Sequence, residues 1–242
     1  MKSRGYFRKM LVIMNKELTV YFTTPIAYIV FAAFLLTTGF YFFVLSPFFF
    51  FGQAELREFF DALPVIFSIT VPAVTMRLIS EERHTGSLEI LMTLPVTSLD
   101  VAMGKFLAAT VFVSLMLVPT LMYVVTVSIV GSLDPGPVAG GYIGAVLLGA
   151  TFSSIGVFAS SISKNQIIAF MIGVGICITL TMIDYFLFFL PAGIVKAFQY
   201  FGLGYHFKNI SKGIIDTRDI IYFLSIIAVA VLGTVKIIEE RR

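Results

Sequence analysis

Residues 72–105 read PAVTMRLISEERHTGSLEILMTLPVTSLDVAMGK, and the rest of the chain is organised around this stretch. It starts in hydrophobic sequence and breaks into a charged run, EERH, at residues 81–84. Thr-Gly-Ser at 85–87 then leads into a short apolar-periodic segment, 88–94. Pro95 ends this segment, because the residue before a proline is biased away from helical geometry. The pattern predicts a short helix on a tight loop between two long hydrophobic segments.

This short helix is expected to be amphipathic. Leu88, Leu91 and Met92 share one of its faces. Either Thr85 or Ser87 is expected to cap the free N–H groups at its start. A plain solvated turn between two helices does not need such an apolar stripe. The stripe therefore indicates a protein partner or the membrane surface.

The composition is that of an integral membrane protein. Hydrophobic residues make up 58% of the 242 residues and charged residues only 13%, whereas roughly a quarter of the residues in a soluble domain are charged. A span needs about 20 apolar residues, which leaves little sequence for a soluble domain. The net charge of +3 gives no indication of nucleic-acid binding. The single cysteine, Cys177, excludes an internal disulfide.

The hydrophobic runs predict an all-α polytopic protein that forms one membrane domain, residues 1–242, with six spans. The expected spans are residues 26–45, 60–79, 102–130, 138–160, 166–190 and 220–238. Capping-box patterns, Thr97-x-x-Asp100 and Ser163-x-x-Gln166, are expected to start the third and fifth spans.

An amphipathic helix is expected over residues 6–22, before the first span. Lys9 and Lys16 lie opposite its apolar face, so the pattern is typical of a basic helix in the membrane interface. Pro25 marks the turn into the bilayer. The apolar residues of this helix that recur at helical spacing include Phe7, Leu11, Met14, Leu18 and Phe22.

The distribution of lysine and arginine predicts the orientation. Basic residues are concentrated in the N-terminal segment, the 77–83 region and the C-terminal tail, which places both termini in the cytoplasm. The segment between the fifth and sixth spans conflicts with this rule, since its four basic residues, Lys196, Lys208, Lys212 and Arg218, then lie outside. We keep the six-span topology because the other loops agree with it.

Two features within the spans bear on assembly and function. Small residues recur at every fourth position of the fourth span, which permits close approach of another helix, within the subunit or across a dimer. Asp184 lies deep in the fifth apolar run. Intramembrane carboxylates are candidates for functional sites, although an interfacial role near the outer surface is equally consistent. The small residues are Gly141, Ala145, Gly149 and Ser153.

The sequence contains no recognisable nucleotide-binding, metal-binding or catalytic motif. It contains no G-x-x-x-x-G-K-[ST] phosphate-binding loop, so no ATPase is expected within the chain. His84 and His206 are far apart and lack the neighbours of a metal site. No catalytic constellation and no cofactor site is predicted. No internal repeat is evident, which disfavours an inverted-repeat secondary transporter.

Residues 72–105 resemble the coupling-helix region of ABC-2-type transporter permeases. The shared pattern is an acidic-basic cluster, then Gly-Thr/Ser-Leu-Glu, then a leucine run ending in Leu-Pro. The PA-x-TMR pattern at 72–77 is closest to the gliding-motility-type permeases. KEL-x-x-YF-x-TPIAYIVF at 16–31 resembles the family's connecting helix, and KGIIDTRDIIYF at 212–223 extends the resemblance through most of the chain.

The resemblance implies the transmembrane subunit of an ABC exporter in a prokaryotic inner or plasma membrane. A separate cytoplasmic ABC ATPase, which binds ATP and Mg, would power it. The implied assembly holds two permeases, either two copies or a copy and a paralogue, and an auxiliary membrane protein is a possible further partner. The residues implied to couple to the ATPase are Glu81, Glu82, Arg83, Thr85, Gly86, Ser87, Leu88, Glu89, Leu91, Met92, Leu94 and Pro95.

The adjacent acids at 81 and 82 support this interpretation. An exposed i,i+4 pair between Arg77 and Glu81 contributes only about 0.2–0.5 kcal/mol, and a helix C-terminus disfavours negative charge. The two carboxylates are therefore expected to serve basic residues on the ATPase. The plain alternative is a solvated charge cluster that ends a span.

Other classes of function remain possible from the sequence. A channel or secondary carrier that is not coupled to ATP would need more ionisable groups along the spans, and it would not need the apolar face of the short helix. A membrane scaffold without transport is a third interpretation.

Overall fold

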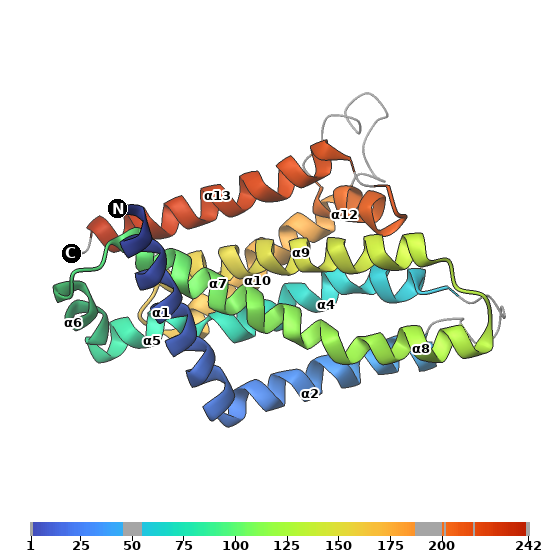
Figure 1. The fold of residues 1–242 in the computed structure, drawn as a ribbon, viewed down its shortest axis with the longest axis horizontal. Coiled ribbons are helices and arrows are strands. Elements are labelled where there is room, and N and C mark those ends of the chain that lie inside the picture. Colours follow the sequence, from blue (N-terminus) through green and yellow to red (C-terminus); the bar gives the residue numbers. More distant parts are fainter. Residues whose placement is uncertain (1, 46–54, 187–199, 201, 215, 241–242) are drawn as a thin grey trace.

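The computed structural model describes residues 2–45, 55–186, 200, 202–214 and 216–240. Among these residues every regular element is a helix, and six helical segments are long and apolar enough to cross a membrane. They lie side by side in one bundle, and both chain termini lie at the same end of it (Figure 1). The all-α, six-span prediction is confirmed. The six segments are Pro25–Leu45, Arg57–Thr85, Ser98–Val130, Pro135–Ile162, Gln166–Asp184 and Thr217–Glu240.

The N-terminal helix α1 (Lys2–Thr23) is inclined to the long axis of the bundle (Figure 1). Thr24 is extended and Pro25 occupies the first turn of α2 (Pro25–Phe40), where a missing N–H has no cost. The chain therefore turns sharply into the first span, which continues as η1 (Tyr41–Leu45). The sequence predicted this turn at Pro25.

The second span is longer than predicted. Helix α4 (Arg57–Thr75) is followed by α5 (Arg77–Thr85), so the EERH run is helical and is not part of a loop. Gly86 then adopts a left-handed conformation, φ 74°, which glycine tolerates without strain. The short helix α6 (Ser87–Thr93) follows and ends at the extended Leu94, before the proline as predicted.

The remaining helices complete the bundle. The third span consists of α7 (Ser98–Leu117), a 3-10 turn η2 around a proline (Val118–Thr120) and α8 (Leu121–Val130). Helices α9 (Pro135–Ile162) and α10 (Gln166–Phe186) are the fourth and fifth spans, and residues 187–190 of the predicted fifth span lie outside the described residues. Helix α12 (Leu203–Ser211) precedes the last span, α13 (Thr217–Glu240).

The structure corrects two of the three predicted caps. The Thr97–Asp100 capping box of α7 is present. Helix α10 is capped instead by Asn165, whose side-chain oxygen accepts from the Ile167 N–H at 2.9 Å. No side chain caps α6, because its N-cap residue is Gly86 and the Thr85 hydroxyl donates back to the Glu81 carbonyl at 3.0 Å.

Helix α9 is the centre of the bundle and packs against α4, α7, α10, α12 and α13. Its small residues permit this. A Cβ atom added to Gly141 would lie 2.3 Å from the ring of Phe60, and one added to Gly149 would lie 2.7 Å from Val113. Ala145 and Ser153 are fully buried. In this structure the small-residue ladder packs within the subunit, against the second and third spans.

Candidate functional site

The coupling segment, defined here as residues 77–95, lies at the end of the bundle that holds both termini (Figure 1). Some apolar residues of α6 and its C-terminal end are buried there and others are exposed. Met92 is only 8% exposed, and Leu88 and Leu91 are half-buried against the core. Ile90 is 70% exposed and Leu94 is 53% exposed. The outward apolar surface of α6 therefore centres on Ile90, which the sequence analysis did not select.

The predicted stripe is turned toward its own subunit for a physical reason. A helix of seven residues gains little stability from its own hydrogen bonds. It is held by burying one face, and Leu88, Leu91 and Met92 supply that face. The periodicity located the apolar stripe, but the remaining apolar residue is the one that is free to contact another molecule.

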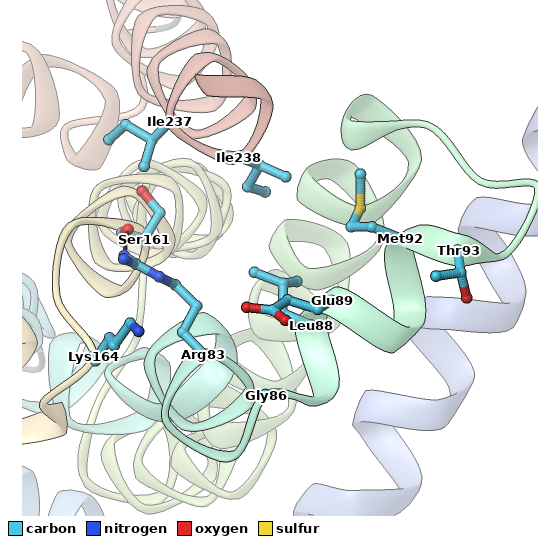
Figure 2. A pocket seen from close by; sticks show the side chains of 10 residues that line it. All are labelled: Arg83, Gly86, Leu88, Glu89, Met92, Thr93, Ser161, Lys164, Ile237 and Ile238. Carbon is cyan, nitrogen blue, oxygen red and sulfur yellow. Dashed lines mark hydrogen bonds between the residues drawn. The ribbon is translucent and has the colours of Figure 1, made fainter. Parts of the chain in front are cut away.

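A cavity of about 740 Å³ lies between α6, the α9–α10 turn and the end of α13. In Figure 2, Arg83 lies beside Ser161 and Lys164, while Leu88 and Glu89 project from α6. The Arg83 guanidinium donates to the Ser161 carbonyl, which fixes one wall. The cavity thus combines basic groups with an apolar patch. Its lining residues are Arg83, Gly86, Leu88, Glu89, Met92, Thr93, Ser161, Lys164, Ile237 and Ile238.

A cluster of four charged residues lies beside the coupling segment. We call Lys16, Glu17, Glu82 and Lys105 the charge cluster. The Lys105 side chain is 0% exposed, and its Nζ lies 2.8 Å from Glu17 Oε1 and 2.9 Å from Glu82 Oε2. It also donates to the Leu78 carbonyl at 2.7 Å. The buried ammonium is therefore matched by two carboxylates and one backbone oxygen.

Lys16 extends the cluster to the surface. Its Nζ lies 2.9 Å from Glu82 Oε1 and 3.5 Å from Glu17 Oε1. Partial burial lowers the pKa of Lys16, but the hydrogen bond and the negative charge of Glu82, together with Glu17, outweigh burial and the pKa is raised. Lys16 therefore carries its positive charge at neutral pH and balances the second carboxylate.

This geometry changes the interpretation of several predicted residues. The sequence predicted that the carboxylate of Glu82 serves a partner, whereas in the structure Lys16 and Lys105 of the same chain neutralise it. Glu81, by contrast, is exposed. Lys9 and Lys16 were expected on a free polar face, but Lys9 donates to the Pro95 carbonyl and Lys16 contacts Glu82. Helix α1 is thus bound to the coupling segment on both sides of α6.

The buried face of α1 differs from the predicted apolar face, because Ile13 and Glu17 were not predicted to belong to it. Ile13, Glu17 and Tyr21 follow one another at i,i+4 spacing and are at most 7% exposed. The predicted apolar residues Leu11, Met14 and Leu18 lie beside this line and are half-buried, Phe22 is exposed, and the side chain of Phe7 lies outside the described part. The sequence signal for this buried face was the position of Glu17, which lies between Ile13 and Tyr21 on one line of the helix.

Helix α5 is fixed to the bundle by the polar side chain of Ser160. The hydroxyl of Ser160, on α9, accepts from the N–H groups of Ile79 and Ser80, both at 3.0 Å, and donates to the Met76 carbonyl at 2.8 Å. These bonds satisfy backbone groups at the junction between α4 and α5, where the helix is interrupted. Helix α5 is therefore a rigid extension of the second span.

The opposite end of the bundle holds Asp184. A Cβ atom added to Gly202 or Gly204 would lie 1.9 Å or 2.3 Å from its carboxylate oxygens, so the carboxylate closely approaches the start of α12. A negative charge is favourable there because of the helix dipole. Asp184 thus lies beside the start of α12, in the last turn of α10 that the structure describes.

His206 forms a second polar contact at that end. Its Nδ1 lies 2.6 Å from Asp219 Oδ1, and both side chains are buried. The sequence pattern predicted no partner for either residue. Within the described part of the chain, no group of three His, Cys, Asp or Glu side chains has the geometry to hold a metal ion.

Comparisons with known proteins agree with this architecture. A family model described as ABC-2 family transporter protein matches residues 11–228, which include most of α1, the coupling segment, the first five spans and the first half of the sixth. A search of curated proteins found no match. Members of this family are the membrane components of ABC transporters and generally work with a cytoplasmic ABC ATPase. The chain belongs to the ABC-2 transporter family and is a multi-pass membrane permease of it.

Proposed function

We propose that this permease couples ATP hydrolysis on a separate cytoplasmic ABC ATPase to the export of a substrate. The observation that carries the proposal is α6, a short helix outside the spans that exposes Ile90 and Leu94 at the end holding both termini. Exposed apolar side chains on an anchored surface helix are typical of a protein contact. Among the coupling residues predicted from the sequence, the exposed ones keep that role as a proposal: Glu81, Thr85, Ser87, Glu89, Leu94 and Pro95.

The assembly follows from this role. The ATPase binds ATP and Mg²⁺, and it contacts the exposed face of α6 together with Glu81 and Glu89. A second permease, identical or a paralogue, completes the translocation pathway within the lipid bilayer. We place the protein in a prokaryotic inner or plasma membrane with both termini in the cytoplasm. Its PA-x-TMR sequence favours the gliding-motility-type subfamily, in which an auxiliary membrane protein is a further partner.

The distribution of buried charge supports this proposal over an ATP-independent channel or carrier. Within the described spans, the buried charged side chains Asp100, Lys105 and Asp219 lie near the ends of their helices. They do not form a row across the membrane. A carrier that moves ions or protons needs ionisable groups along its path.

The docking face can be tested by mutation of Ile90 and Leu94. Replacing both with aspartate is expected to lower the affinity for the ATPase by at least 10-fold, because burial of each apolar side chain contributes about 1.5–3 kcal/mol. The measurement is co-purification of the ATPase with the permease, together with the ATP hydrolysis rate of the complex. Leu88 and Leu91 are unsuitable for this test because they also pack against their own subunit.

Ile214→Asp is the matched control. Ile214 is 63% exposed, close to the exposure of Ile90, and lies at the opposite end of the bundle after α12. This variant is expected to retain the ATPase. Full association and hydrolysis in the Ile90→Asp, Leu94→Asp variant would contradict the proposed docking face.

A further inference from the structure

The charge cluster joins three elements that are far apart in the sequence. Lys16 and Glu17 belong to α1, Glu82 belongs to α5 and Lys105 belongs to α7. The connection is direct, because Lys105 contacts Glu17 and Glu82 within 3 Å and reaches the α5 backbone at Leu78. A displacement of any one of these helices therefore acts on the other two.

The elements around the cluster are held by different contacts. Helix α6 joins α5 at Gly86, which adopts a left-handed conformation. Helix α5, by contrast, is held by Ser160 and by the cluster. Helices α1 and α7 approach so closely at the next turn that a Cβ atom on Gly104 would lie 2.8 Å from Ile13. Force applied at α6 is thus received by α5 and passed on where helices are in direct contact.

Charged residues suit this position better than apolar ones for one physical reason. A buried ion pair adds little net stability over a well-packed apolar replacement, because desolvation offsets the attraction. Charge-assisted hydrogen bonds, however, fix the distance and direction between groups. Apolar surfaces can slide past one another, whereas a four-charge cluster keeps the helices in register during movement.

We infer that the charge cluster is the junction that transmits movement of the coupling segment to α1 and to the third span. Lys105 is its central positioning residue, because it contacts both carboxylates while its side chain is fully buried. This inference rests on the proposed function, in which an ATPase moves the coupling segment. The role of the cluster is to convert a local displacement at α6 into a displacement of two helices.

The test removes the charges while keeping the shape. In the triple variant Glu17→Gln, Glu82→Gln, Lys105→Met, no uncompensated charge remains buried, and the protein is expected to elute and unfold as the wild type does. Hydrogen–deuterium exchange is measured on the permease–ATPase complex in lipid nanodiscs, without nucleotide and after trapping with ATP and vanadate. In the wild type, the exchange rates of residues 77–95 and of α1 are both expected to differ between the nucleotide-free and the trapped states.

The triple variant is expected to keep the change in residues 77–95 and to lose at least half of the change in α1. Glu82→Asp, which retains the charge but shortens the side chain, serves as a second variant. It is expected to lose part of the nucleotide-dependent change in α1. The control is Lys236→Gln with Glu240→Gln, which removes an exposed ion pair of 3.8 Å on α13. This control is expected to behave as the wild type.

The outcomes distinguish failure of the junction from failure of the proposed function. If the triple variant and Glu82→Asp show the full wild-type change in α1, the cluster does not transmit movement, and the proposed function stands. If the wild-type complex shows no nucleotide-dependent change in residues 77–95, the proposed function fails and this inference fails with it.

Discussion

Replacing Lys105 with methionine alone is expected to destabilise the permease by about 3–5 kcal/mol, because breaking a buried ion pair leaves uncompensated charge. Two carboxylates, Glu17 and Glu82, would then share only Lys16, which is 53% exposed and reaches the edge of the cluster. The expected result is a lower unfolding midpoint in detergent and a reduced yield of monodisperse protein.

The neutral triple variant described above is the control for this effect. It removes the two carboxylates together with the ammonium, so its stability is expected to return close to that of the wild type. An unfolding midpoint for Lys105→Met equal to that of the wild type would show that the buried charges are not paired in the folded protein.

Gly156→Ala is expected to have the second large effect, a loss of about 1–3 kcal/mol from overpacking. A Cβ atom at this position would lie 1.9 Å from Thr75 Oγ1 and 2.8 Å from Thr75 Cβ. The Thr75 side chain is fully buried and donates to the Val71 carbonyl at 3.0 Å, so it cannot move aside at low cost. Helices α4 and α9 would have to separate.

Gly175→Ala on the neighbouring span is the matched control. No atom lies within 4 Å of an added Cβ there, so the variant is expected to gain up to about 1 kcal/mol from the better helix propensity of alanine. Unfolding midpoints of the two variants in the same detergent provide the comparison. Equal midpoints would indicate that α9 does not pack against Thr75 as described.

The sequence was sufficient for the architecture because the bilayer imposes simple rules. Each span needs a long apolar run, so the six spans, the turn at Pro25 and the short helix before Pro95 could all be located without the structure. The small-residue ladder indicated that α9 is closely packed. It could not show which helix packs there, because Gly141 fits against any bulky neighbour.

The site was harder to predict because it depends on how helices are rotated about their axes. Glu81 and Glu82 are adjacent and chemically identical, yet one is exposed and the other is paired with Lys105, 23 residues further along the chain. The pairing partner of a buried carboxylate is set by tertiary packing and leaves no local signal. For the same reason Ile90, and not Leu88, is the exposed apolar residue of α6.

The central claim is that α6 is the docking point for an ABC ATPase, and photo-crosslinking from position 90 in intact cells tests it most directly. A photoreactive phenylalanine analogue replaces Ile90 in one strain and Ile214 in another, and crosslinked partners are identified by mass spectrometry. We expect position 90 to capture a protein whose peptides include a G-x-x-x-x-G-K-[ST] motif, and position 214 not to capture it. Capture of such a protein from position 214 alone, or its absence at position 90, would contradict the claim.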